Sequence, residues 1–99
     1  MIIIPLKSVA SQTFAINLDG QNCTINLYQK NTGLYLDLFV DNTAIIVTQI
    51  CLDRVKLVRY TYLGFVGDLS FMDTQGVDDP YYTGLGSRYQ LMYLSASEL

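Results

Sequence analysis

The sequence predicts an all-β fold, either a small antiparallel β-barrel or a sandwich of about six to seven short strands. Apolar and polar residues alternate with a period of two over most of the 99 residues, as they do in strands that bury one face. Residues that favour turns interrupt this alternation about every eight to twelve residues. A chain of this length is expected to form one domain, residues 1–99.

The clearest predicted hairpin surrounds the dipeptide Asp19-Gly20. A two-residue hairpin turn needs a positive φ at both central positions, and Asp-Gly is one of the dipeptides that favour it. This pattern predicts two antiparallel strands that each bury one face. The alternating apolar residues on the two sides of the turn are Phe14, Ile16, Leu18, Cys23, Ile25 and Leu27.

Two further turns, at 30–33 and at Asp41-Asn42, bound a third expected strand over residues 34–40. The run that follows, Thr43 to Leu52, is rich in β-branched residues and is apolar on both faces. Such a run predicts a strand that is central in its sheet, or one whose outer face is covered by a partner.

At the N-terminus, Pro5 ends a short run of isoleucines. Because proline lacks the N–H that a central ladder needs, residues 1–6 are expected to form an edge strand or an arm. The remaining expectations are a weakly alternating run at 53–60, a strand at 67–73, a long loop at 74–87 and a final strand at 89–93.

The composition argues against several classes of function. Only 15% of the residues are charged and the net charge is −3, whereas a nucleic-acid binder normally carries a basic face. The chain contains no histidine, which excludes an imidazole base or metal ligand. No run reaches the ~18 apolar residues of a membrane helix, and no basic region like that of a signal peptide precedes the first isoleucines. We therefore expect no binding to nucleic acid or membrane, no cofactor, and synthesis in the cytoplasm.

The two cysteines, Cys23 and Cys51, lie far apart in runs that read as strands. Free cysteine behaves as a small hydrophobic residue and is among the most buried residue types, and nothing in the sequence indicates secretion. We expect both thiols to be buried, reduced and unbridged, with a disulfide as the alternative.

Two pairs of carboxylates are candidate chemical sites. Asp78 and Asp79 could bind a divalent cation, but no further carboxylates follow at alternating positions, and the other interpretation is a solvated loop. Asp37 and Asp68 could act as the acid and base of a glycosidase, but no aromatic sugar platform stands out. With no histidine and no pair of nucleophile and base, the chain is not expected to be an enzyme.

Three groups of residues are candidates for a protein interface. Tyr81 and Tyr82 have the apolar body and polar tip that suit interface anchors, and core packing is the other interpretation. The isoleucines are expected to contact another subunit, because a proline-ended edge strand can add to a neighbouring sheet. The basic residues form either a docking face for an acidic partner or an ordinary solvent-facing strand edge. The isoleucines are Ile2, Ile3 and Ile4, and the basic residues are Arg54, Lys56 and Arg59.

A series of short motifs runs through nearly the whole chain. In order, they are Leu18-Asp19-Gly20, Tyr35-Leu36-Asp37-Leu38, Asp79-Pro80, Leu85-Gly86, Arg88, Tyr93-Leu94 and Glu98-Leu99. In this order and spacing the sequence resembles the small baseplate plug proteins of contractile-tailed (myovirus) bacteriophages. It departs from their pattern by the absence of a tryptophan from the third strand.

The resemblance implies a non-enzymatic structural protein of the virion, located in the tail baseplate. It further implies several copies that bind one another and the central hub or tube proteins. Residues 78–94 would then be a recurring structural ending, in which Arg88 ties the loop through Asp78 or Asp79. The alternative, which does not depend on the resemblance, is a small carbohydrate- or ligand-binding module whose platform is Tyr81, Tyr82 and Asp78.

Overall fold

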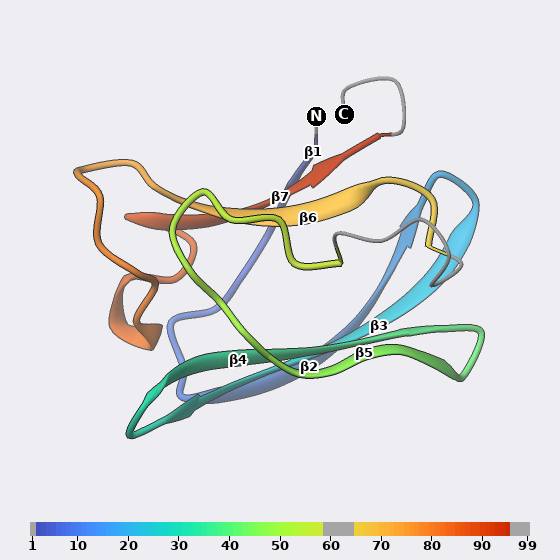
Figure 1. Cartoon of the computed structure of the whole chain (residues 1–99), viewed down its shortest axis with the longest axis horizontal. Helices are drawn as coiled ribbons and strands as arrows, with labels where there is room; N and C mark the ends of the chain where they lie inside the picture. The colour runs from blue at the N-terminus through green and yellow to red at the C-terminus, as the bar shows by residue number, and fades with distance from the viewer. Residues whose placement is uncertain (1, 59–64, 96–99) are drawn as a thin grey trace.

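The structure is a computed structural model that describes residues 2–58 and 65–95. Its strands form two antiparallel sheets stacked face to face, which makes the fold all-β and sandwich-like and not a closed barrel (Figure 1). One sheet has the order β1-β7-β6 and the other the order β2-β3-β4-β5. The elements are β1 (Ile2–Ile4), β2 (Ser11–Leu18), β3 (Gln21–Lys30), β4 (Gly33–Val40), β5 (Thr43–Ile50), β6 (Asp68–Asp73), the 3₁₀ turn η2 (Tyr82–Gly84) and β7 (Tyr89–Leu94).

The hairpins of the four-stranded sheet follow the turn residues. Asp19 and Gly20 have φ values of 51° and 79°, and β2 pairs with β3 without a break from Ser11↔Tyr28 to Leu18↔Gln21. Asp41 and Asn42 have φ values of 50° and 66° and join β4 to β5. Positive φ at both central positions is the geometry that Asp and Asn tolerate best among non-glycine residues, so both predicted turns are confirmed.

The strand β5 differs from its prediction in one respect. It lies at the edge of its sheet, so a central position is wrong, and the strand ends at Ile50. Its pairing with β4 shifts register where Thr48 adopts a φ of 55°. The Asp37 carboxylate accepts a hydrogen bond from the Thr48 N–H at 2.7 Å, which holds the irregular backbone in place. A bulge of this kind twists an edge strand away from further pairing.

The weakly alternating run at 53–60 does not form a strand over its described part, 53–58. Its backbone instead makes two isolated bridges to β6, where the Arg54 N–H binds the Phe71 carbonyl and the Leu57 N–H binds the Leu69 carbonyl. The predicted alternation holds for the exposed Arg54 and Lys56 and the buried Leu57, but it fails at Val58, which is buried as well. The segment therefore covers the outer edge of β6 without regular pairing.

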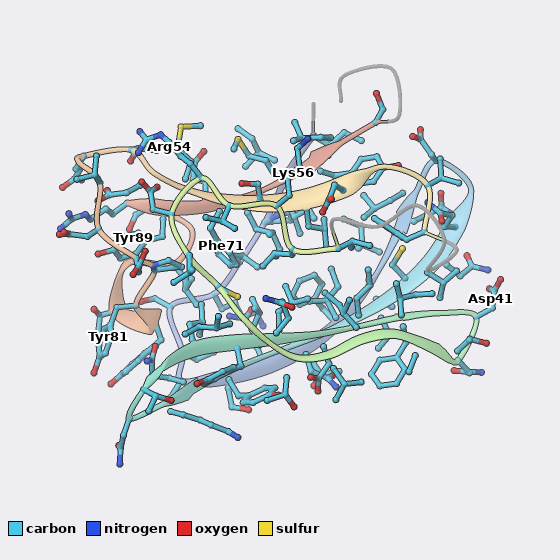
Figure 2. The ribbon with its side chains drawn as sticks, in the orientation of Figure 1. Asp41, Arg54, Lys56, Phe71, Tyr81 and Tyr89 are labelled. Atoms are coloured by element: carbon cyan, nitrogen blue, oxygen red, sulfur yellow. The ribbon has the colours of Figure 1, made fainter. Side chains whose placement is uncertain are left out.

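The core lies between the two sheets. Alternate residues of β3 and β4, among them Leu27 and Leu36, point toward Phe71 and Leu91 of the other sheet, and all of them are buried. Figure 2 shows Phe71 in this inner layer. The Tyr93 hydroxyl lies 2.8 Å from the Asp19 carboxylate and so links the hairpin turn of one sheet to β7 of the other.

Both cysteines belong to this core. Cys23 and Cys51 are buried and free. Burial raises the pKa of the Cys51 thiol well above its usual range, because the charged thiolate would lose its hydration. Burial also raises the pKa of Cys23. Their place in the core agrees with the interpretation of both residues as small hydrophobic side chains.

We predict that replacing Gly67 by alanine destabilises the fold far more than replacing Gly20. Both glycines have a positive φ, of 92° and 79° respectively. A Cβ at Gly67 would overlap the Leu94 carbonyl oxygen and lie 2.6 Å from the Tyr93 hydroxyl, whereas a Cβ at Gly20 would meet nothing. Urea denaturation should give a loss of about 1 kcal/mol for Gly20→Ala and about 3 kcal/mol for Gly67→Ala. Equal losses would show that backbone strain alone decides both positions.

Candidate interaction surfaces

The three N-terminal isoleucines do not share one environment. Ile4 is 2% exposed and packs in the protein's own core, whereas Ile2 and Ile3 are 46% and 52% exposed. Ile2 pairs with Tyr93 and Ile3 with Met92, so β1 lies at the edge of the three-stranded sheet, as the proline-ended run predicts. Of the three residues, Ile2 and Ile3 are therefore the ones available to a partner.

The long loop from residue 74 to residue 88 is organised by one buried carboxylate, that of Asp73. Its two oxygens accept hydrogen bonds from the Arg88 Nε and Nη2, each at 2.8 Å, and from the backbone N–H groups of Gln75 and Asp78, each at 2.9 Å. The loop connects the end of β6 to the start of β7, so Asp73 and Arg88 close its base (Figure 1). This arrangement was not predicted, because nothing in the sequence singles out Asp73 from its neighbours.

Arg88 also binds the Asp78 carboxylate, at 2.8 Å, which confirms one of the two expected partners. Asp79 points elsewhere, and its carboxylate accepts the Asp53 N–H at 3.0 Å. Asp53 in turn accepts the Asp73 N–H at 2.8 Å. Asp78 and Asp79 therefore serve as structural ties of the loop, which agrees with its interpretation as a structural ending.

These contacts set the protonation of the ion pair. The two hydrogen bonds from Arg88, reinforced by the Gln75 and Asp78 N–H groups, hold the pKa of the Asp73 carboxyl well below its usual range, although burial opposes this shift. The same bonds from Asp73 raise the pKa of Arg88. The pair is charged throughout the neutral range and keeps the loop closed there.

Tyr81 and Tyr82 sit side by side on this loop, with ring centroids 5.0 Å apart. Tyr81 is 48% exposed, whereas Tyr82 packs partly against the core. The Tyr82 N–H binds the Gln29 side chain of β3 at 3.2 Å, which fixes the pair beside the β3–β4 turn. Together with that turn they line a depression of about 570 Å³, whose other walls are Ala10, Gln29, Lys30, Asn31, Thr32, Gly33, Asp79 and Pro80.

The carbohydrate-type platform of Tyr81, Tyr82 and Asp78 is not formed as expected. The Asp78 carboxylate is bound to Arg88 and is not among the residues that line the depression. The candidate acid and base, Asp37 and Asp68, also belong to different sheets, since Asp37 is part of β4 and the buried Asp68 is part of β6.

The basic cluster is only partly described, because Arg59 lies outside the described residues. Arg54 pairs with the Asp53 carboxylate and donates to the Gly76 carbonyl at 3.1 Å, while half of its side chain stays exposed. Lys56 is exposed on the same covering segment. Figure 2 shows both residues on the side of the three-stranded sheet, away from Tyr81. The basic residues and the tyrosine pair therefore belong to different surfaces.

A further surface was missed by the sequence reasoning, the outer face of the four-stranded sheet. Among the residues of β2, β3 and β4 it carries only two charges of opposite sign, those of Lys30 and Asp37, and the Asp37 carboxylate accepts a hydrogen bond from the Tyr28 hydroxyl at 3.0 Å. Tyr28 and Tyr35 stack at 6.0 Å, and the Lys30 ammonium lies 5.3 Å from each ring. The outer-face residues are Ser11, Thr13, Ala15, Asn17, Asn22, Thr24, Asn26, Tyr28, Lys30, Tyr35, Asp37 and Phe39. The period of two could have identified this face, had the polar positions been read together.

Residues 2–58 and 65–95 contain neither a cluster of metal-binding side chains nor a membrane-spanning helix. In these ranges no three acidic or cysteine side chains gather closely enough to hold a metal ion. The same ranges contain no helix long and apolar enough to span a membrane.

The chain matches the model of a known protein family. The family model described as cyanophage baseplate Pam3 plug gp18 matches residues 1–96. No curated protein matches the chain. The match covers both sheets and the loop between β6 and β7.

We predict that Asp73→Asn destabilises the fold at neutral pH and has less effect in acid. The pKa of the Asp73 carboxyl is lower in the fold than in the unfolded chain. The carboxylate therefore stabilises the fold at pH values above its unfolded pKa of about 3.9, and this stabilisation is lost as the pH falls below that value. The variant should melt about 5 °C or more below the wild type at pH 7, and this gap should shrink below about pH 4. Thermal melts from pH 7 down to about pH 2 measure it.

The matched control for this prediction is Asp78→Asn. Asp78 binds the same arginine, but its side chain is largely exposed, and exposed ion pairs stabilise little. Its melting temperature should therefore stay close to that of the wild type. Equal melting temperatures for the two variants would contradict the central position of Asp73 in the loop.

Proposed function

The chain belongs to the cyanophage baseplate Pam3 plug gp18 family, and from this we propose that it is a structural protein of the phage tail baseplate that binds the central hub or tube proteins. The observation that carries the proposal is the match over residues 1–96. We further propose that it is present in several copies, is made in the host cytoplasm, and catalyses no reaction.

A protein whose role is assembly acts through binding, and its surfaces support that role. Interfaces gain most of their energy from buried apolar and aromatic side chains at their centre, with charges at the rim that orient the partners. The exposed apolar residues on this molecule include Ile2 and Ile3 on β1 and Tyr81 on the loop between β6 and β7. The strand and the loop present them on separate surfaces. A subunit that meets more than one neighbour would need such separate contacts.

Tyr81 is the proposed anchor of one contact. Its ring is half exposed, yet its backbone is part of a loop pinned by Asp73, so it loses little conformational entropy on binding. The Tyr82 ring contacts the Tyr81 ring and packs partly on the core. A partner side chain that enters the depression beside the β3–β4 turn would cover the Tyr81 ring.

Arg54 and Lys56 are the proposed orienting charges on the side of the three-stranded sheet. Arg59 remains part of this proposal as the third basic residue of the run. Rim charges of this kind raise the association rate at low salt more than they change the final affinity. The partner surface that fits them is acidic.

The direct test of the function is cryo-electron microscopy of intact tails. The fold, with its two stacked sheets, should account for density in the baseplate next to the hub or tube. Purified tails that infect normally and lack the chain would overturn the proposal.

We predict a division of roles between the tyrosines and the basic residues. Tyr81→Ala should weaken incorporation into tails at any salt concentration, by about thirtyfold, since loss of an interface anchor costs about 2 kcal/mol. Replacing Arg54 and Lys56 by alanine should slow incorporation at low salt and have less effect at high salt. Assembly of tails from purified components measures both.

The control for the tyrosines is Tyr82→Ala, which should lower the melting temperature of the isolated chain because Tyr82 packs on the core. Tyr81→Ala should leave that temperature unchanged. If Tyr81→Ala assembles normally, or if it melts as early as Tyr82→Ala, the anchor role is refuted.

We also predict that Ile2→Ser combined with Ile3→Ser weakens assembly while the isolated domain stays folded. Both side chains are about half exposed, so their loss removes more apolar area from a contact with another chain than a buried residue would, and less from the protein's own core. Ile4→Ser is the matched control and should instead destabilise the domain, because it buries a hydroxyl in the core. Normal assembly of the double variant would show that β1 contacts no partner through these residues.

A further inference from the structure

The two sheets have four edges, and three of them carry features that prevent pairing with another chain. Natural proteins protect edge strands by keeping them short, by bulges, by proline or by covering segments. The strand β1 has only 3 residues and is followed by Pro5. The strand β5 carries the irregularity at Thr48. The edge of β6 is covered by residues 53–58, in which Asp53 and Lys56 form isolated bridges to β6.

The fourth edge, β2, has none of these features. It is 8 residues long, contains no charge, proline or glycine, and pairs with β3 in one unbroken register. Within residues 2–58 and 65–95, β2 pairs with β3 and with no other strand. Uncharged strands of this length with free backbone donors and acceptors are templates for a further strand.

The side chains of β2 also fit a further strand. Its outer-face residues, which include Thr13, Ala15 and Asn17, are small, uncharged and exposed. Its inner-face residues Phe14 and Ile16 pack on the core but are only half buried, because no strand of the described part of the chain lies beyond them. A neighbouring strand with the same alternation would cover these two side chains without bringing charge into the core.

We propose that β2 pairs antiparallel with β2 of a second copy of this chain, around a two-fold axis at Ala15. A register shift of one residue would turn inner residues toward the outer face, so only registers that keep the faces matched are allowed. With Ala15 opposite Ala15, Phe14 faces Ile16 of the second copy and Thr13 faces its Asn17. Apolar residues then meet apolar ones, small polar residues meet each other, and the four-stranded sheets join into one.

The charges at the two ends of β2 favour a second copy over an unrelated strand. Lys7 is held beside the start of β2 by two hydrogen bonds between its backbone and the Gln12 side chain, at 3.1 and 2.7 Å. Asp19 follows its other end. Antiparallel pairing places Asp19 of the second copy opposite Ser11, at the end of the ladder where Lys7 lies, so each end of the ladder carries one residue of each charge.

This pairing deepens the proposed presence of several copies by naming the surface between two of them, and its test uses the isolated chain. An eight-residue ladder buries a small area, so we expect association in the micromolar range, on the order of 10 μM. Failure of the pairing would leave the baseplate role intact, whereas absence from tails would leave the pairing intact.

The experiment compares Ala15→Lys with Ala44→Lys by sedimentation velocity from about 1 to 500 μM, a range that brackets the expected constant. Both alanines are exposed on the outer face of the four-stranded sheet, one on β2 and the other on the irregular edge β5. Ala15→Lys should weaken dimerisation about tenfold or more, because it places two ammonium groups side by side at the axis. Ala44→Lys should dimerise like the wild type, and both should melt at the wild-type temperature.

A second measurement tests the register. Paired residues in an antiparallel ladder have Cα atoms about 4.5–5.5 Å apart, within the range of a disulfide. Under oxidised glutathione, Ala15→Cys should form a covalent dimer in high yield and Ala44→Cys should not. The proposal would be overturned if the wild type stayed monomeric over the whole concentration range. It would also be overturned if the two lysine variants dimerised equally, or if the two cysteine variants cross-linked equally. A monomer whose Ala15→Lys variant fails to enter tails would assign the edge to a strand of another baseplate protein, which also overturns self-pairing.

Discussion

The buried carboxylate of Asp73 holds together the end of the molecule where the long loop connects β6 to β7 within the three-stranded sheet. It receives four hydrogen bonds, two from Arg88 and two from the loop backbone. The Asp73 N–H continues the network to Asp53, and the Asp53 N–H continues it to Asp79. Because every lone pair that faces the interior has a donor, the charge is buried at low cost, and it ties β6, β7 and the segment after β5 into one unit.

This network explains how a loop without regular structure can present a binding surface. Tyr81 and Tyr82 lie in its second half, and Ser8 reaches across to the Tyr82 and Thr83 carbonyls at 3.1 and 2.8 Å. The loop is therefore fixed at its base by Asp73 and at its far side by Ser8 and Gln29. Aromatic side chains on a fixed backbone lose little freedom on binding, which favours their use as anchors.

The distribution of charge separates the surfaces of the molecule. Arg54 and Asp53 form a pair on the covering segment, whereas the outer face of the four-stranded sheet is nearly neutral and is lined by small polar residues and the stacked Tyr28 and Tyr35. A small subunit with few charges leaves large areas that can be covered at little desolvation cost. Membership of a baseplate plug family agrees with such neutral surfaces, since it implies contact with other baseplate components.

The sequence by itself determined the strands, the turns at Asp19-Gly20 and Asp41-Asn42, and the alternation that separates core from surface. These features depend on near neighbours in the chain, because turn geometry and the period of two act over a few residues. The tertiary structure alone decided that Ile4 belongs to the core, that β5 is an edge, that residues 53–58 cover β6 without forming a strand, and that Asp73 meets Arg88. Each of these depends on contacts between segments far apart in sequence, and a local pattern contains no information about which distant segment satisfies an edge or a buried charge.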